Sequence, residues 1–139
     1  MPKKTCSSRK RPVRKNLKDL DLEISFMEGI VRRDPAYVDA LQILGDDYTR
    51  RGRHTDGLKV DESLAKLRPE DALIHYNLAC SYSLTKQCEL AAEQLETAID
   101  LGYRDFKWLS KDPDLLNLRA NQQYERVRIK IRQLKIKAE

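Results

Sequence analysis

The sequence predicts an all-α fold, and three observations carry that prediction. Apolar side chains recur at helical spacing, the chain matches itself at a fixed offset, and Pro35, Gly52 and Pro69 stand where helices would have to end. With 139 residues, of which 40% are hydrophobic, the chain is long enough for one domain with its own core. No apolar run approaches the roughly 18–20 residues that a bilayer crossing needs. We therefore expect a soluble protein, without membrane contact, in the cytoplasm.

The first helix is predicted over residues 17–33. Its apolar side chains recur at intervals of four, three and four residues, which places them on one face of a helix. Asp34-Pro35 should end it, because proline disfavours helical geometry in the residue that precedes it. The apolar stripe consists of Leu20, Ile24, Met27 and Val31.

The chain repeats itself at an offset of 34 residues. Small residues recur at fixed places in each copy, where two helices would approach closely, and large apolar residues fill the volume between them. The matching pairs are Pro35 with Pro69, Leu44-Gly45 with Leu78-Ala79, Tyr48 with Tyr82, Gly57-Leu58 with Ala91-Ala92, Ala65 with Ile99 and Leu67 with Leu101. This period, with a small residue after leucine and a tyrosine three positions on, resembles the tetratricopeptide (TPR) repeat. The resemblance implies a right-handed superhelical stack of antiparallel helix pairs.

The repeat pattern also divides the chain. We expect a disordered basic tail over 1–16, because that segment carries seven basic side chains and no acidic one. A single helical domain should follow over 17–139. Its parts are a capping half repeat (17–34), repeat 1 (38–68), repeat 2 (72–101) and closing helices (105–137). The closing segment should contain short helices at 105–110 and 114–120 and a last helix at 122–137, although the alternation in VRIKIRQLKIK would also suit a strand.

One stretch, HYNLACSYSLTKQCELA, raises the question of a metal or redox site. His75, Cys80 and Cys88 lie within it, but zinc sites usually need four ligands in close pairs, and redox pairs usually follow the C-x-x-C spacing. Asp112 and Asp114 are conceivable ligands for a hard cation, although Asp112 is a better candidate for a helix cap. We expect no metal and no cofactor, and helix packing for the histidine and cysteines. No nucleophile or phosphate-loop motif occurs, so we expect a protein that is not an enzyme.

A partner-binding groove is what the resemblance implies, because the first helix of each TPR pair lines a concave surface that binds a peptide or partner helix. The expected exposed positions of repeat 1 are Asp39, Gln42, Ile43, Asp46, Thr49 and Arg50. Those of repeat 2 are Leu73, Tyr76, Asn77, Cys80, Ser83 and Leu84, with Lys107 and Lys111 from the closing segment.

Some TPR proteins clamp the carboxylate of a chaperone tail with lysine, asparagine and arginine. Asn77 matches one position of that clamp, and Lys107 and Lys111 fall near its basic positions. Gln42 and Asp46 depart from it, and acidic residues there would repel an acidic peptide. A mixed or basic partner segment suits repeat 1 better.

The sequence thus predicts a non-enzymatic adaptor or scaffold that binds an unidentified protein or peptide. The alternative is a nucleic-acid- or ribosome-associated accessory protein, because both ends are basic while residues 17–123 carry a net charge of −6. A tail that folds back on this acidic body, or only keeps the chain soluble, explains the same charges. A second alternative is a structural protein that self-associates through the second apolar face of the last helix. We expect a monomer or a weak homo-oligomer.

Overall fold

A computed structural model describes residues 16–138, and within this range the chain forms helices joined by short loops, without strands. The basic tail predicted over 1–16 lies, except for Asn16, outside the described residues. The described chain divides into two compact units that meet at Pro69 and Glu70. This boundary falls between the two predicted repeats. The single domain predicted over 17–139 stays a prediction, and each unit is described by itself.

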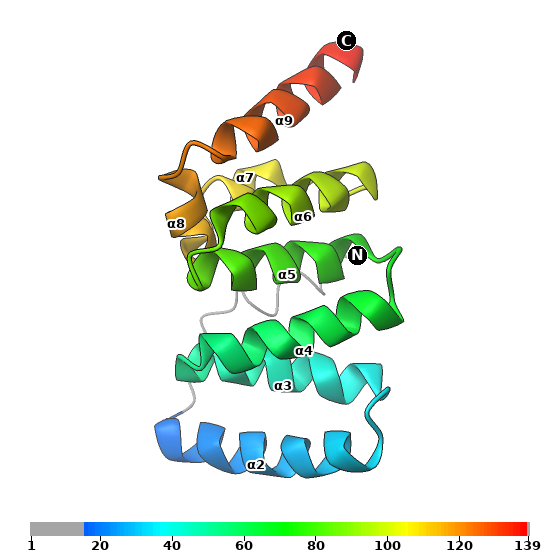
Figure 1. The fold of residues 1–139 in the computed structure, drawn as a ribbon, viewed down its shortest axis with the longest axis vertical. Coiled ribbons are helices and arrows are strands. Elements are labelled where there is room, and N and C mark those ends of the chain that lie inside the picture. The colour runs from blue at the N-terminus through cyan, green and yellow to red at the C-terminus, as the bar shows by residue number, and fades with distance from the viewer. Residues whose placement is uncertain (1–15, 139) are drawn as a thin grey trace. The chain divides into compact units, whose positions relative to one another are not determined.

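The first unit contains three helices in sequence: α2 (Leu17–Arg33), α3 (Val38–Arg51) and α4 (His54–Leu67). Successive helices run antiparallel beside one another, α2 with α3 and α3 with α4 (Figure 1). Asn16 caps α2, since its side chain accepts a hydrogen bond from the backbone N–H of Asp19. As predicted, α2 ends before Asp34-Pro35, and Gly52 ends α3 in the left-handed conformation at φ = +84°.

The buried stripe of α2 is the one that the spacing predicts, because Leu20, Ile24 and Met27 are all buried. Two polar contacts tie α2 to α3 beside this stripe. The Tyr48 hydroxyl donates to Glu28, and the Arg51 guanidinium pairs with Asp21. Between α3 and α4, a Cβ atom built at Gly57 would lie 3.4 Å from Thr49 Oγ1. The backbones therefore approach closely there, which is the reason we expected a small residue.

The second unit begins with an antiparallel pair, α5 (Ala72–Leu84) and α6 (Cys88–Asp100). The Asp71 side chain caps α5 by accepting from the backbone N–H groups of Leu73 and Ile74. The turn between the helices has no glycine, and Lys86 adopts the left-handed conformation in its place, at φ = +63°.

Short helices close the second unit: α7 (Phe106–Leu109), the 3₁₀ turn η1 (Pro113–Leu115) and α8 (Leu116–Arg119). The helix predicted over 114–120 is thus split into a 3₁₀ turn and an α-helical turn. Asp112 sets this start, because its side chain accepts from the Asp114 N–H while Pro113 occupies the first position. The η1 and α8 segments pack against α5.

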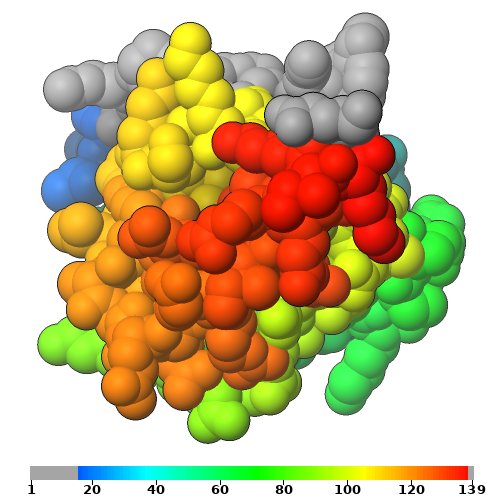
Figure 2. Space-filling model, turned by 90° about the horizontal axis from the view of Figure 1, so that it is seen from above, coloured from blue at the N-terminus to red at the C-terminus, as the bar shows by residue number. Residues whose placement is uncertain are grey.

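The last helix, α9 (Tyr124–Ala138), confirms the helical reading of VRIKIRQLKIK. It packs on α6, to which the ion pairs Arg126–Glu96 and Lys130–Asp100 attach it. Val127 is buried, whereas Ile129 and Ile136 are exposed on the other side, so the second apolar face is present as expected. Figure 2 shows α9, orange to red, at the surface of this unit. None of the helices in the described part is long and apolar enough to span a membrane.

Candidate functional site

The predicted groove residues fall into two groups, one on α3 in the first unit and one on α5 and the segment after it in the second. On α3, Asp39 is exposed, and most of its neighbours along the same face are half-buried. Ile43 belongs to this face and is 41% exposed. The half-buried residues are Gln42, Asp46, Thr49 and Arg50. We call Asp39, Gln42, Ile43 and Asp46 the α3 face.

The α3 face carries acidic and apolar character side by side. Asp39 makes no side-chain hydrogen bond or ion pair within the described residues. Thr49, by contrast, uses its hydroxyl internally, as a donor to the Gly45 carbonyl one turn earlier in the helix. The groups available to a partner are therefore the Asp39 carboxylate, the half-exposed Gln42 amide and the exposed Ile43 side chain.

Three predicted groove residues on α5 are buried, and their expected exposure is wrong. Tyr76, Cys80 and Ser83 each expose 1% of their surface or less. The reason is that the chain's own closing segment covers them, since η1 and α8 pack on that face of α5. The other predicted residues of the second unit are half-buried on α5 (Leu73, Asn77 and Leu84) or exposed after it (Lys107 and Lys111).

Asp112 is the centre of this covered region. Its Oδ2 atom accepts a hydrogen bond from the Tyr76 hydroxyl at 2.6 Å and lies 3.7 Å from Cys80 Sγ. The Tyr76 ring stacks on Tyr103, with 4.4 Å between ring centroids. Burial raises the pKa of Tyr76 far above its ordinary value, and the neighbouring Cys80 and Asp112 raise it further.

A second anchor of the covering segment lies two turns along α5 from Tyr76. The Ser83 hydroxyl oxygen accepts from the backbone N–H of Leu118 at 3.1 Å, and the Ser83 carbonyl accepts from the Asn117 side chain. The Arg119 guanidinium also donates to the carbonyls of Leu109 and Asp112. These polar groups are therefore engaged by the chain itself and hold the closing segment in place.

The histidine and cysteines of the second unit do not gather as a trio. His75 Nδ1 lies 2.7 Å from the Gln94 Oε1 atom of α6, a packing position as expected, and Cys80 lies with Asp112 and Asp114 instead. In that cluster Asp112 Oδ2 is bonded to Tyr76, and Asp112 Oδ1 caps η1. The cap was predicted from the sequence, but the contact with Tyr76 was not, because the two residues are 36 positions apart. The absence of a metal stays a prediction.

Basic residues on one flank of α9 form a separate exposed surface. Arg128, Arg132 and Lys135 recur at helical spacing and, with Ile131, line a shallow depression. Their acidic neighbour is Glu125 of the same helix, at 3.6 Å from Arg128 and 3.9 Å from Arg132. We call Arg128, Arg132 and Lys135 the α9 basic stripe.

The chain is similar over part of its length to a known protein. No family model matches the chain. Over 84 residues the chain is 36% identical to a protein of Arabidopsis thaliana whose name describes it as chloroplastic. That match covers 58% of this chain and 25% of the relative, so the chain corresponds to about a quarter of that protein's length.

Proposed function

We propose that the chain is a non-enzymatic protein–protein interaction module of TPR type, and that its α3 face binds a partner segment. The supporting pattern is the 34-residue repeat, together with two antiparallel helix pairs whose bounds follow the predicted repeats. A right-handed superhelical stack is part of this proposal. The observation that carries the binding surface is that the α3 face stays accessible, whereas the equivalent face of α5 is covered.

The chemistry of the α3 face defines the partner. Exposed Asp39 and the nearby Asp46 favour a basic or mixed segment and repel an acidic one. Ile43, exposed at the centre of the face, supplies an apolar anchor. The partner is therefore an extended or helical segment with apolar and basic residues on one side. A clamp for an acidic chaperone tail is disfavoured, because the α3 face has the wrong sign of charge.

The experiment places a photo-crosslinking residue at Ile43 in the full chain and, as a matched control, at exposed Lys59 of α4. We expect a crosslinked partner from position 43 and none from position 59. With the partner segment in hand, the double variant Asp39→Lys/Ile43→Ser should bind at least about tenfold more weakly, since a charge and an anchor are lost together. Lys59→Ala should bind as the wild type does. Equal crosslinking at both positions would exclude the α3 face.

A second candidate function rests on the α9 basic stripe. Its three cations could contact successive phosphates of a nucleic acid, which is the function that the basic termini suggest. Binding of a fluorescent single-stranded RNA should then weaken steeply with salt, and replacing Arg128 and Arg132 by glutamine should reduce the salt slope. RNA binding that is absent at low ionic strength would rule this candidate out.

The name of the Arabidopsis thaliana relative gives a chloroplast location for that protein. A chloroplast location for this chain is a proposal that competes with the predicted cytoplasmic one. Imaging of a fluorescent fusion in the source cell would decide between them.

A further inference from the structure

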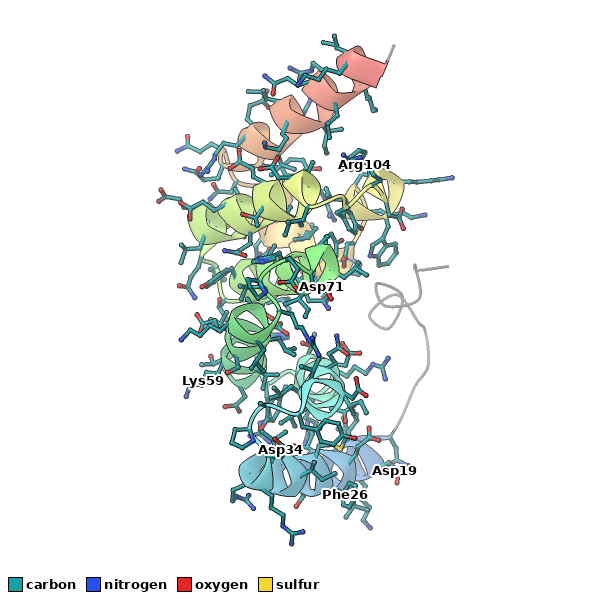
Figure 3. The ribbon with its side chains drawn as sticks, turned by 90° about the vertical axis from the view of Figure 1, so that its right-hand side faces the viewer. Asp19, Phe26, Asp34, Lys59, Asp71 and Arg104 are labelled. Carbon is teal, nitrogen blue, oxygen red and sulfur yellow. The ribbon has the colours of Figure 1, made fainter. Side chains whose placement is uncertain are left out.

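The side of α2 that faces away from α3 carries exposed apolar side chains. Leu22 is 67% exposed and Phe26 is 69% exposed. Phe26 projects from α2 on the side opposite α3 (Figure 3). In sequence these residues belong to a set with intervals of three, four, three and four positions: Asp19, Leu22, Phe26, Gly29 and Arg33. We call these five residues the α2 outer stripe.

The spacing of the α2 outer stripe is that of a helix–helix contact. Intervals of three and four keep residues on one face, as in the seam of two packed helices. The other face of α2 already has its partner, since Leu20, Ile24 and Met27 are buried in the first unit. A helix with apolar residues on two opposite faces buries both only when a second element packs on it.

The stripe is complementary to itself under a two-fold rotation. Asp19 and Arg33 lie seven positions on either side of Phe26, which is about 10.5 Å along the helix axis in each direction. A two-fold axis at Phe26 therefore places Asp19 of each copy opposite Arg33 of the other. The same rotation places Leu22 close to Gly29, on both sides of a central Phe26–Phe26 contact.

The groups that this pairing needs are available. Neither the Asp19 carboxylate nor the Arg33 guanidinium makes an ion pair within residues 16–138, whereas Asp21 on the flank of the same helix is bonded to Arg51. A Cβ atom built at Gly29 would meet nothing within 4 Å, which leaves room for an incoming Leu22. The signs of Asp19 and Arg33 also suit the dipole of their own helix, but the dipole does not account for exposed Leu22 and Phe26.

We infer that two copies of this chain associate through α2 as an antiparallel, two-fold symmetric helix pair. The occupant of the stripe is thus a second copy, and the surface is different from the face of the last helix that the sequence suggested for self-association. Two single helices bury less than the roughly 1,200 Å² of a standard interface, so the dimer is weak and depends on concentration. The inference does not rest on the proposed partner-binding function, because the α3 face is not part of this stripe.

The test is sedimentation velocity on the full chain over a concentration series that reaches the millimolar range. Phe26→Ala, Asp19→Arg and Arg33→Asp should each weaken dimer formation by at least about tenfold, because each removes the central contact or creates two like-charge oppositions. Lys59→Asp, an exposed charge change on α4, should leave the dimer unchanged. Circular dichroism establishes that each variant remains helical.

The decisive arm mixes two variants. Asp19→Arg alone places arginine against arginine, and Arg33→Asp alone places aspartate against aspartate. In an equimolar mixture, a dimer of two unlike copies places arginine against aspartate at both ends, so the mixture should dimerise more strongly than either variant alone. The double variant Asp19→Arg/Arg33→Asp likewise restores opposite charges at both ends of its own dimer. That double variant should therefore dimerise within about threefold of the wild type. A wild-type chain that stays monomeric throughout, a dimer indifferent to Phe26→Ala, or a double variant that stays monomeric would each overturn the inference.

Discussion

The two helix pairs carry the same 34-residue register, yet the same face of the first helix is accessible in one unit and covered in the other. Gln42 and Tyr76 are equivalent positions, as are Thr49 and Ser83. On α3 these residues remain half-buried, whereas on α5 they lie beneath η1 and α8. Within the second unit, the closing segment folds back on α5 and covers this face. A repeat position therefore specifies the side of a helix, and the neighbouring segment decides whether solvent, a partner or the chain itself occupies that side.

The largest difference in stability should come from truncating the two equivalent residues Gln42 and Tyr76 in turn. Tyr76→Ala removes a buried ring that stacks on Tyr103 and a hydroxyl that bonds Asp112, so we expect a loss of about 4 kcal/mol in the free energy of unfolding. Gln42→Ala should change it by less than about 0.5 kcal/mol.

Urea unfolding checks this contrast. The chain has one tryptophan, Trp108, which lies in the second unit, so its fluorescence follows that unit, while circular dichroism follows both. Equal midpoints for the two variants would contradict the covering of α5.

An intermediate effect is expected at alkaline pH. Burial raises the pKa of Tyr76 in the folded chain, so above the ordinary tyrosine value of about 10 the unfolded chain loses a proton that the folded chain keeps. The unfolded state then binds fewer protons, and stability falls as pH rises, by up to about 1.4 kcal/mol per pH unit for one such group. Below a pH of about 10 this contribution is fully present. In the Tyr76→Phe variant, the free energy of unfolding measured by Trp108 fluorescence should fall less steeply above a pH of about 10.

The matched control is Tyr48→Phe in the first unit. The pKa of Tyr48 is also raised, first by burial and then by its hydrogen bond to Glu28. Because Tyr48 belongs to the other unit, its replacement should not change how the stability reported by Trp108 fluorescence falls at alkaline pH. If both variants reduce the loss of stability equally, deprotonation of Tyr76 is not its cause.

The smallest difference in stability should come from truncating the two equivalent residues Thr49 and Ser83 in turn. Ser83→Ala removes the acceptor for the buried Leu118 N–H and should cost about 1 kcal/mol. The Thr49 hydroxyl bonds a carbonyl of its own helix, so Thr49→Ala should cost less than about 0.5 kcal/mol. Denaturant titrations of both variants provide the measurement, and a costlier Thr49→Ala would reverse the comparison.

Much of the local structure could be predicted from the sequence. The spacing of Leu20, Ile24 and Met27 predicted the buried face of α2, and Pro35 and Gly52 predicted the ends of two helices, all of which are confirmed. Asp112 was predicted as a helix cap and is one. These features depend on residues within one or two helical turns of each other, where backbone geometry alone brings them together.

The candidate site was predicted less completely, because the exposure of its residues depends on contacts between segments that are distant in the sequence. The register placed Tyr76 and Cys80 on the groove-lining side of α5. Nothing in the spacing indicated that Asp112, 36 positions beyond Tyr76, would cover them. The exposed α2 outer stripe was missed for a related reason. Its intervals are visible in the sequence, but the exposure of Leu22 and Phe26 depends on which side of α2 the rest of the first unit packs against.

The sequence by itself determined that the described chain is helical, where α2 and α3 end, and which side of α2 packs inward, because helix periodicity and caps act over short distances. Only the tertiary structure decided which equivalent positions remain available. Burying the Tyr76 ring and satisfying its hydroxyl requires the closing segment to fold back on α5, and no described element of the first unit covers the α3 face in that way. The α3 face and the α2 outer stripe are therefore the surfaces at which to look for partners.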